Sequence, residues 1–124
     1  MSTYIDTILS ANENLLIYRS DSLTLVIPFF EDEEHTILYT DLANWDELKM
    51  TVRENYDSLK EIIVLELGSG ISVVDNVMTL TFTSDQMNLL NQDFVYDIEG
   101  KTGAIVGTVL RGLLKRANDV SKNN

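Results

Sequence analysis

The residues that could do chemistry are few, and the first group surrounds the single histidine. His35 directly follows four consecutive acidic residues at positions 31–34, and an imidazole beside carboxylates can form a metal site or an acid–base pair. A lone histidine is a poor ligand set for zinc. The acidic run also lacks the Asp-x-Asp-x-Asp-Gly spacing that wraps a chain around Ca²⁺. We therefore interpret residues 31–35 as a solvated turn and predict no metal site.

A second group contains glycines and serines that resemble parts of phosphate and acyl-transfer sites. Gly68 and Gly70 follow an apolar run, as a phosphate-binding loop would, but the Lys-Ser/Thr pair and a following helix are both missing. Ser69 and Ser84 have no neighbouring base, because the only histidine belongs to the acidic segment. The glycines therefore indicate a turn, and the serines are not predicted nucleophiles.

The remaining candidates are the carboxylates Asp97 and Glu99, which share one face if their segment is a strand. Paired carboxylates act as acid and base only when their surroundings differ enough to keep one protonated, and no feature of the sequence indicates such a difference between these two. The chain has no cysteine, which excludes disulfides, thiolate metal sites and cysteine nucleophiles. We expect a protein that is not an enzyme and takes no cofactor.

Length and composition predict one globular domain. The 124 residues have a mass of 14.0 kDa, with 44% hydrophobic and 23% charged residues, and no apolar run approaches the ~18 residues of a membrane span. The first residues lack the basic start and apolar middle of a secretory signal, so we expect synthesis in the cytoplasm without export. Neither a membrane nor an oxidising compartment is predicted.

Residues 77–99 are the most informative about the fold. Met78, Leu80 and Phe82 alternate with threonines, which is the pattern of a strand with one buried face. Thr83 and Gln86 form a capping-box pair, which predicts a short helical turn near residues 84–91. A second alternating run begins at position 94. A helical turn between two strands favours a crossing between two packed sheets over a tight hairpin.

The rest of the chain shows the same alternation. Pro28 argues that its strand lies at a sheet edge. We expect an all-β fold, a small antiparallel sandwich of about seven strands, with an amino-terminal arm at 1–14, the sandwich at 15–120 and a polar tail at 121–124. Strands are predicted at 15–30 with a break near 19–22, and at 36–40, 48–53, 62–67, 71–74, 77–83, 94–99 and 104–116, the last two joined by a loop at 100–103.

Charge is distributed unevenly along the chain. Residues 1–100 hold nineteen of the twenty acidic residues and four of the nine basic ones, whereas residues 101–124 have an excess of basic residues. The basic end is predicted either to contact an acidic surface or to be a solvated strand with a basic tail. The acidic body argues against nucleic acid as a partner. The last strand looks apolar on both faces, and its predicted partner contacts are Arg111, Lys115, Arg116, Val106, Leu110 and Leu114.

Several segments, taken in order, resemble a known family. They are residues 23–29, 40–45 leading into 48–53, 78–85 and 94–99, and the two most specific matches are 41–44 (Asp-Leu-Ala-Asn) and 94–98 (Phe-Val-Tyr-Asp-Ile). Over residues 15–120 the chain resembles the immunoglobulin-like amino-terminal domain of tailed-phage baseplate upper proteins and related tail, neck and head accessory proteins. It departs from that family at 19–22, where a Gly-Asp-Thr turn is expected. The family's carboxy-terminal part also has no counterpart here.

The resemblance implies a non-enzymatic structural subunit of a phage particle, made in the host cytoplasm. Such a subunit would contact other virion proteins and copies of itself in the head, neck, tail or baseplate. Two alternatives stay open on the sequence. One is an acidic cytosolic inhibitor or immunity-type protein that covers a basic partner enzyme. The other is a carbohydrate-binding module, for which Trp45, Tyr39 and Tyr56 would have to form a flat aromatic platform.

Overall fold

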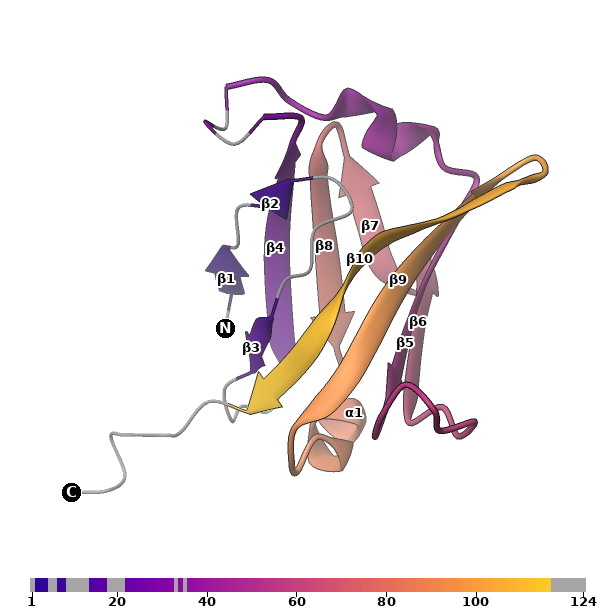
Figure 1. Cartoon of the computed structure of the whole chain (residues 1–124). Helices are drawn as coiled ribbons and strands as arrows, with labels where there is room; N and C mark the ends of the chain where they lie inside the picture. The colour runs from indigo at the N-terminus through magenta and orange to yellow at the C-terminus, as the bar shows by residue number, and fades with distance from the viewer. Residues whose placement is uncertain are drawn as a thin grey trace.

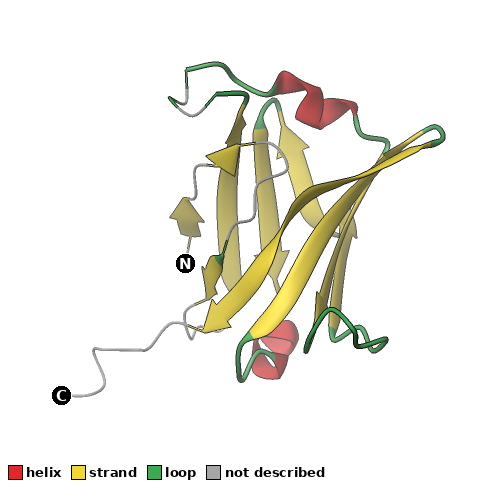
Figure 2. Ribbon diagram, viewed as in Figure 1, coloured by secondary structure: helices red, strands yellow, loops and turns green. Residues whose placement is uncertain are grey.

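The fold is built almost entirely from strands, which confirms the all-β prediction. The computed structural model describes residues 2–4, 7–8, 14–17, 22–32, 34 and 36–116, and strands account for 59% of these described residues. The two short helices lie at opposite ends of the strands (Figure 2). In the described part of the chain, neither helix has the length and apolar composition required to cross a membrane.

The strands form one mixed sheet that curls and is nearly closed into a barrel (Figure 1). Its hydrogen-bonded order is β1-β4-β8-β7-β6-β5-β9-β10-β3, with β2 also beside β4. The elements are β1 (Ser2–Tyr4), β2 (Thr7–Ile8), β3 (Leu15–Ile17), β4 (Leu23–Phe30), the 3-10 helix η1 (Thr40–Asn44), β5 (Glu47–Arg53), β6 (Ile63–Leu67), β7 (Gly70–Val74), β8 (Val77–Phe82), α1 (Ser84–Leu89), β9 (Phe94–Thr102) and β10 (Ile105–Arg116).

A corner between β6 and β7 divides this sheet into two halves. These two strands pair in parallel at only two positions, and a true parallel ladder needs a crossover far longer than the two residues that separate them. Gly68 and Gly70 have φ angles of 88° and 101°, a region that favours glycine. The chain therefore bends here and divides the sheet into two halves. We call one the β5–β9–β10 half, which also includes β6 and β3, and the other the β4–β8–β7 half, which also includes β1 and β2.

The core fills the space between the two halves. Along β4 every second side chain is buried and its neighbours are half-buried, as expected for a strand with a single buried face. The same alternation continues on β8. The buried cluster comprises Leu15, Ile17, Leu23, Leu25, Ile27, Phe29, Leu42, Leu48, Met50, Val52, Ile63, Leu65, Ile71, Met78, Leu80, Phe82, Leu90, Phe94, Tyr96, Ile98, Val109, Leu110 and Leu114.

Helix α1 has the predicted capping box and covers one end of the core. The Gln86 backbone N–H donates to the Thr83 hydroxyl at 3.2 Å, and the Thr83 N–H donates to the Gln86 side chain at 2.9 Å. A helix of six residues is not stable alone. It is held by Leu90, which is buried, and by Met87, which packs against the core.

Two predicted boundaries were wrong. Residues 36–40 do not form a strand: Leu38 makes one isolated bridge to Phe30, and η1 follows at once. The Asp32 carboxylate accepts the N–H groups of Thr36 and Ile37, so those donors are not available to a ladder. The loop at 100–103 is also shorter than predicted, because β9 continues to Thr102 and only two residues turn the chain.

The last strand contains a β-bulge at Val109, between Thr108 and Leu110. Thr108 pairs with Glu99 and Leu110 with Ile98, so Val109 is the extra residue. A bulge turns two consecutive side chains to one side, and Val109 and Leu110 are both buried. Val109 and Leu110, which the predicted alternation places on opposite faces of this strand, therefore face the same core.

The amino-terminal arm supplies two short strands to the outer edge of β4. Strand β1 pairs in parallel with residues 24–26, and β2 pairs with Phe29 and Phe30. Pro28 lies in the gap between these two pairings, and proline has no backbone N–H to donate there. The prediction that this strand lies at a sheet edge was wrong, because β1 and β2 lie outside β4. Residues 121–124, the predicted tail, lie outside the described residues.

Candidate interaction surfaces

The acidic turn after β4 is organised by hydrogen bonds. The Asp32 carboxylate accepts from the backbone N–H of Thr36 at 3.0 Å and of Ile37 at 2.8 Å, and also from the Thr36 hydroxyl. These bonds, the one from the Thr36 side chain first, hold the pKa of Asp32 below its ordinary value. His35 lies outside the described residues. Among those described, no three potential metal ligands come together.

The other candidate chemical groups have structural roles where the structure describes them. Ser69 is in the corner between β6 and β7, where its N–H donates to the Glu66 carbonyl at 2.7 Å. Ser84 is the first residue of α1. No helix follows Gly70, because β7 begins there. None of these groups is brought near another one that could activate it.

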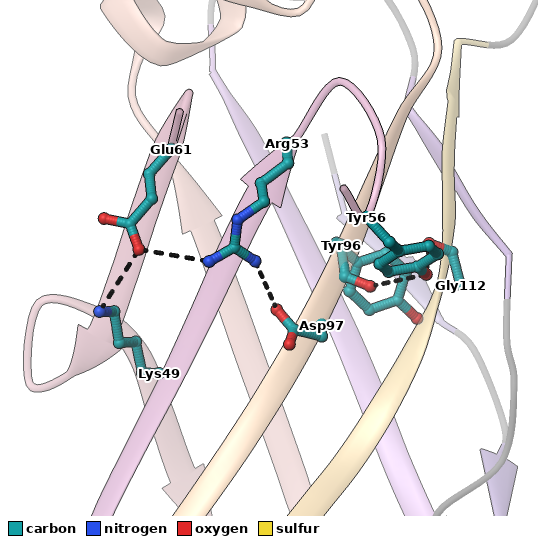
Figure 3. Close-up of polar contacts among 7 residues, drawn as sticks. All are labelled: Lys49, Arg53, Tyr56, Glu61, Tyr96, Asp97 and Gly112. Atoms are coloured by element: carbon teal, nitrogen blue, oxygen red, sulfur yellow. Dashed lines mark hydrogen bonds and ion pairs between the residues drawn. The ribbon is translucent and has the colours of Figure 1, made fainter. Parts of the chain in front are cut away.

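The outer surface of the β5–β9–β10 half carries charged residues on β5, β6, β9 and β10. Glu61 lies 3.7 Å from the Lys49 ammonium and 3.5 Å from the Arg53 guanidinium, and Arg53 lies 3.6 Å from Asp97 (Figure 3). Asp97 is therefore an ion-pair partner of Arg53. We define the charged face as Lys49, Arg53, Glu66, Asp97, Glu99, Arg111 and Lys115.

Tyr56 fastens the loop after β5 across β9 and β10. Its hydroxyl donates to the carbonyls of Gly112 at 2.9 Å and Tyr96 at 3.2 Å (Figure 3). The guanidinium carbon of Arg111 lies 4.4 Å from the centre of the Tyr56 ring, a cation–π geometry. Arg111, predicted as a partner contact, therefore has a partner within its own chain.

The other predicted contact residues divide between core and surface. Leu110 and Leu114 are completely buried, so a partner cannot reach them. The bulge at Val109 shifts the alternation of this strand, so Val106 does not share the inward face of Leu110. Arg116 donates from its side chain to the Leu90 carbonyl at 3.2 Å. Lys115 and Val106 are exposed, as the prediction requires. Their role as contacts stays a prediction.

The β9–β10 hairpin projects beyond the body of the molecule (Figure 1) and rests on Trp45. Gly100 and Gly107 are paired across the hairpin. A Cβ atom on Gly100 would lie 2.4 Å from the indole, whereas one on Gly107 would lie 3.5 Å away. Trp45 therefore requires glycine at position 100, a constraint that local sequence patterns do not reveal.

The aromatic residues considered for glycan binding do not form one platform. Trp45 precedes β5 and Tyr56 follows it, so the length of that strand, about 23 Å at ~3.3 Å per residue, separates them. Tyr39 is partly buried, and this burial raises the pKa of its hydroxyl above the ordinary value. The carbohydrate alternative loses its structural basis.

The outer surface of the β4–β8–β7 half carries no charged side chain among the described residues. Thr24 lies opposite Thr81, Val26 opposite Thr79, and Pro28 opposite Val77, and β7 adds two more uncharged residues. Sequence reasoning missed this surface, although the uncharged alternate positions of 23–30, 71–74 and 77–82 together could have indicated it. We define the neutral face as Thr24, Val26, Pro28, Phe30, Ser72, Val74, Val77, Thr79 and Thr81.

Comparison with known proteins adds nothing to these observations: no protein-family model matches the chain, and no curated protein matches it.

Proposed function

We propose that this chain is a non-enzymatic structural subunit of a tailed-phage particle, built as an immunoglobulin-like sandwich. The strand order supports the fold part of the proposal. The β4–β8–β7 half has the B-E-D order of an immunoglobulin domain, and β5–β9–β10 has its C-F-G order. Strand β6 beside β5 takes the position of the extra strand of variable-type domains.

The observation that carries the functional part is the neutral face. The centres of protein–protein interfaces are depleted in charged residues relative to the remaining surface. This chain has 23% charged residues, and yet three neighbouring strands present none outward. Val74 remains 70% exposed there. Such a surface suits contact with another protein better than permanent exposure to water.

The subunit would join its neighbours in the head, neck, tail or baseplate, through this face and the exposed end of the β9–β10 hairpin. At that end Ile105 and Val106 are 65% and 60% exposed. Both residues extend past the core, so folding alone does not account for their apolar character.

Mass spectrometry of purified phage particles and assembly intermediates tests the proposal. We expect the polypeptide at a fixed copy number per particle. A phage whose gene is replaced by the Thr79→Lys variant should lose the subunit from its particles, whereas Val64→Lys, a change on the opposite outer surface, should retain it. Absence of the wild-type polypeptide at every assembly stage would refute the particle role.

A second function, inhibition of a basic enzyme, is favoured by one specific observation. The segment that crosses the end of the sandwich between β4 and β5 carries Glu31, Asp32, Glu34, Asp41 and Asp46, and no lysine or arginine lies between positions 28 and 48. An acidic surface of this kind attracts basic partners. Capture of one host enzyme from lysate at low salt, reversed by high salt and coupled to loss of its activity, would favour this function over the first.

A further inference from the structure

We infer that the neutral face is the surface on which two copies of this chain pack together. The inference rests on the proposed use of this face as a contact surface and adds the identity of the partner. It does not depend on where in a particle the subunit is placed.

Charge permits a second copy as the occupant of this face and disfavours a strongly basic partner. Each chain has a formal net charge of −11, so two copies repel one another through most of their surfaces. On the neutral face no like charges would be brought opposite each other. A strongly basic partner would find no carboxylate to pair with on these three strands, and it would be attracted instead to the acidic crossing segment at the end of the sandwich.

The residue types are also complementary to themselves. Threonine hydroxyls both donate and accept hydrogen bonds, so a row of threonines can pair with the same row on another copy. Thr24 and Thr81 form such a pair across β4 and β8, and Thr79 lies between Val26 and Ser72. A two-fold axis through the face would bring identical patches together, as an isologous dimer requires.

The residue types of the face suit sheet-on-sheet packing. Its side chains are short or branched at Cβ, apart from Phe30 at one end, and they lose little rotamer freedom on contact. Three strands spaced ~4.8 Å apart and about six residues long cover about 300 Å². A stable interface buries about 800 Å² per partner. The contact is therefore weak in solution and is reinforced when many copies are held together.

The salt dependence of self-association distinguishes this contact from others. Raising the ionic strength screens the repulsion between two acidic chains, while a contact without charges loses no attraction of its own. Self-association through the neutral face should therefore strengthen with salt. Pairing of the basic carboxy-terminal region with the acidic body of another copy would weaken instead, so the sign of the salt effect separates the two arrangements.

Sedimentation equilibrium of the isolated full-length chain at low and high NaCl, up to millimolar protein, tests the inference. We expect reversible dimers whose association constant rises with salt. Thr79→Lys should lower that constant at least tenfold, and Val64→Lys, which changes the net charge equally, should alter it less than twofold. Thr79→Val keeps the face uncharged and should retain the dimer, and thermal unfolding verifies that each variant is folded.

A wild-type chain that stays monomeric at all concentrations, or that associates equally well with Thr79→Lys, overturns the inference. So does association that weakens with salt. Failure here is distinct from failure of the particle role: a monomeric chain found in particles overturns only the dimer, and a dimer absent from particles overturns only the particle role.

Discussion

The two outer faces of this molecule enclose the same core but differ in charge: one carries several charged side chains and the other carries none among the described residues. On the charged face, Lys49, Arg53 and Asp97 are linked through Glu61 and each other. The neutral face has no charged group in any of its three strands. The inward residues of both halves form the shared core, so the two faces differ in their outward residues.

This difference bears on the expectation drawn from the net charge of segments. The basic end of the chain is predicted either to contact an acidic surface or to be solvated, and Arg111 and Arg116 contact groups of their own chain. Opposite charges that already neighbour one another have less to gain from a partner. The face that lacks such internal partners is the one that an association can bury at low cost.

The sharpest stability contrast lies within a single strand. Leu80 faces the core and is completely buried, whereas Thr79 beside it belongs to the neutral face. Leu80→Ala should lower the free energy of unfolding by about 2–5 kcal/mol, and Thr79→Val should change it by less than about 0.5 kcal/mol. Urea unfolding at low protein concentration measures both values. Equal losses would mean that the neutral face is also needed for folding.

The hairpin of the β5–β9–β10 half provides the next contrast. Gly100→Ala places a Cβ atom 2.4 Å from the Trp45 indole, while Gly107→Ala on the paired strand leaves 3.5 Å. We expect the first change to cost about 1–3 kcal/mol through overpacking and the second to be nearly neutral. Thermal unfolding with tryptophan fluorescence measures the effect on Trp45 directly. A neutral Gly100→Ala variant would contradict the close contact.

A smaller loss of stability is expected at Tyr56, which holds the loop after β5 against β9 and β10. Tyr56→Phe keeps the ring beneath Arg111 but removes the hydroxyl that donates to the Gly112 and Tyr96 carbonyls. Stability should fall by about 1 kcal/mol. The reciprocal variant Arg111→Gln keeps the hydroxyl and should cost less. Amide hydrogen exchange at positions 54–60 would show whether the loop is released, and unchanged exchange in Tyr56→Phe would argue against the fastening.

The smallest effect belongs to the ion pairs of the charged face. Arg53 and Asp97 are each about one-quarter exposed, and exposed pairs contribute between 0 and about 1 kcal/mol. A double-mutant cycle with Arg53→Gln and Asp97→Asn should give a coupling energy in that range that diminishes with added NaCl. A coupling that salt leaves unchanged would show that the pair is shielded from solvent.

Local patterns predicted the features that depend on neighbouring residues. The alternation on β8 and the Thr83–Gln86 capping box were correct because each is set within a few positions. The bulge at Val109 was missed because it depends on register with β9. The absence of a strand at 36–40 was missed because the Asp32 side chain takes the needed donors. The contact between Trp45 and Gly100 was missed because it depends on residues that are far apart in the sequence. The neutral face was missed for the same reason.

Concentration-dependent amide chemical shifts of the full-length chain compare the two faces within one molecule. Between dilute and millimolar protein at high salt, we predict shifts confined to β4, β7 and β8 and centred on Thr79, with residues of β5, β9 and β10 unchanged. Shifts that gather on the charged face, or spread evenly over both faces, would contradict the assignment of the neutral face as the contact surface.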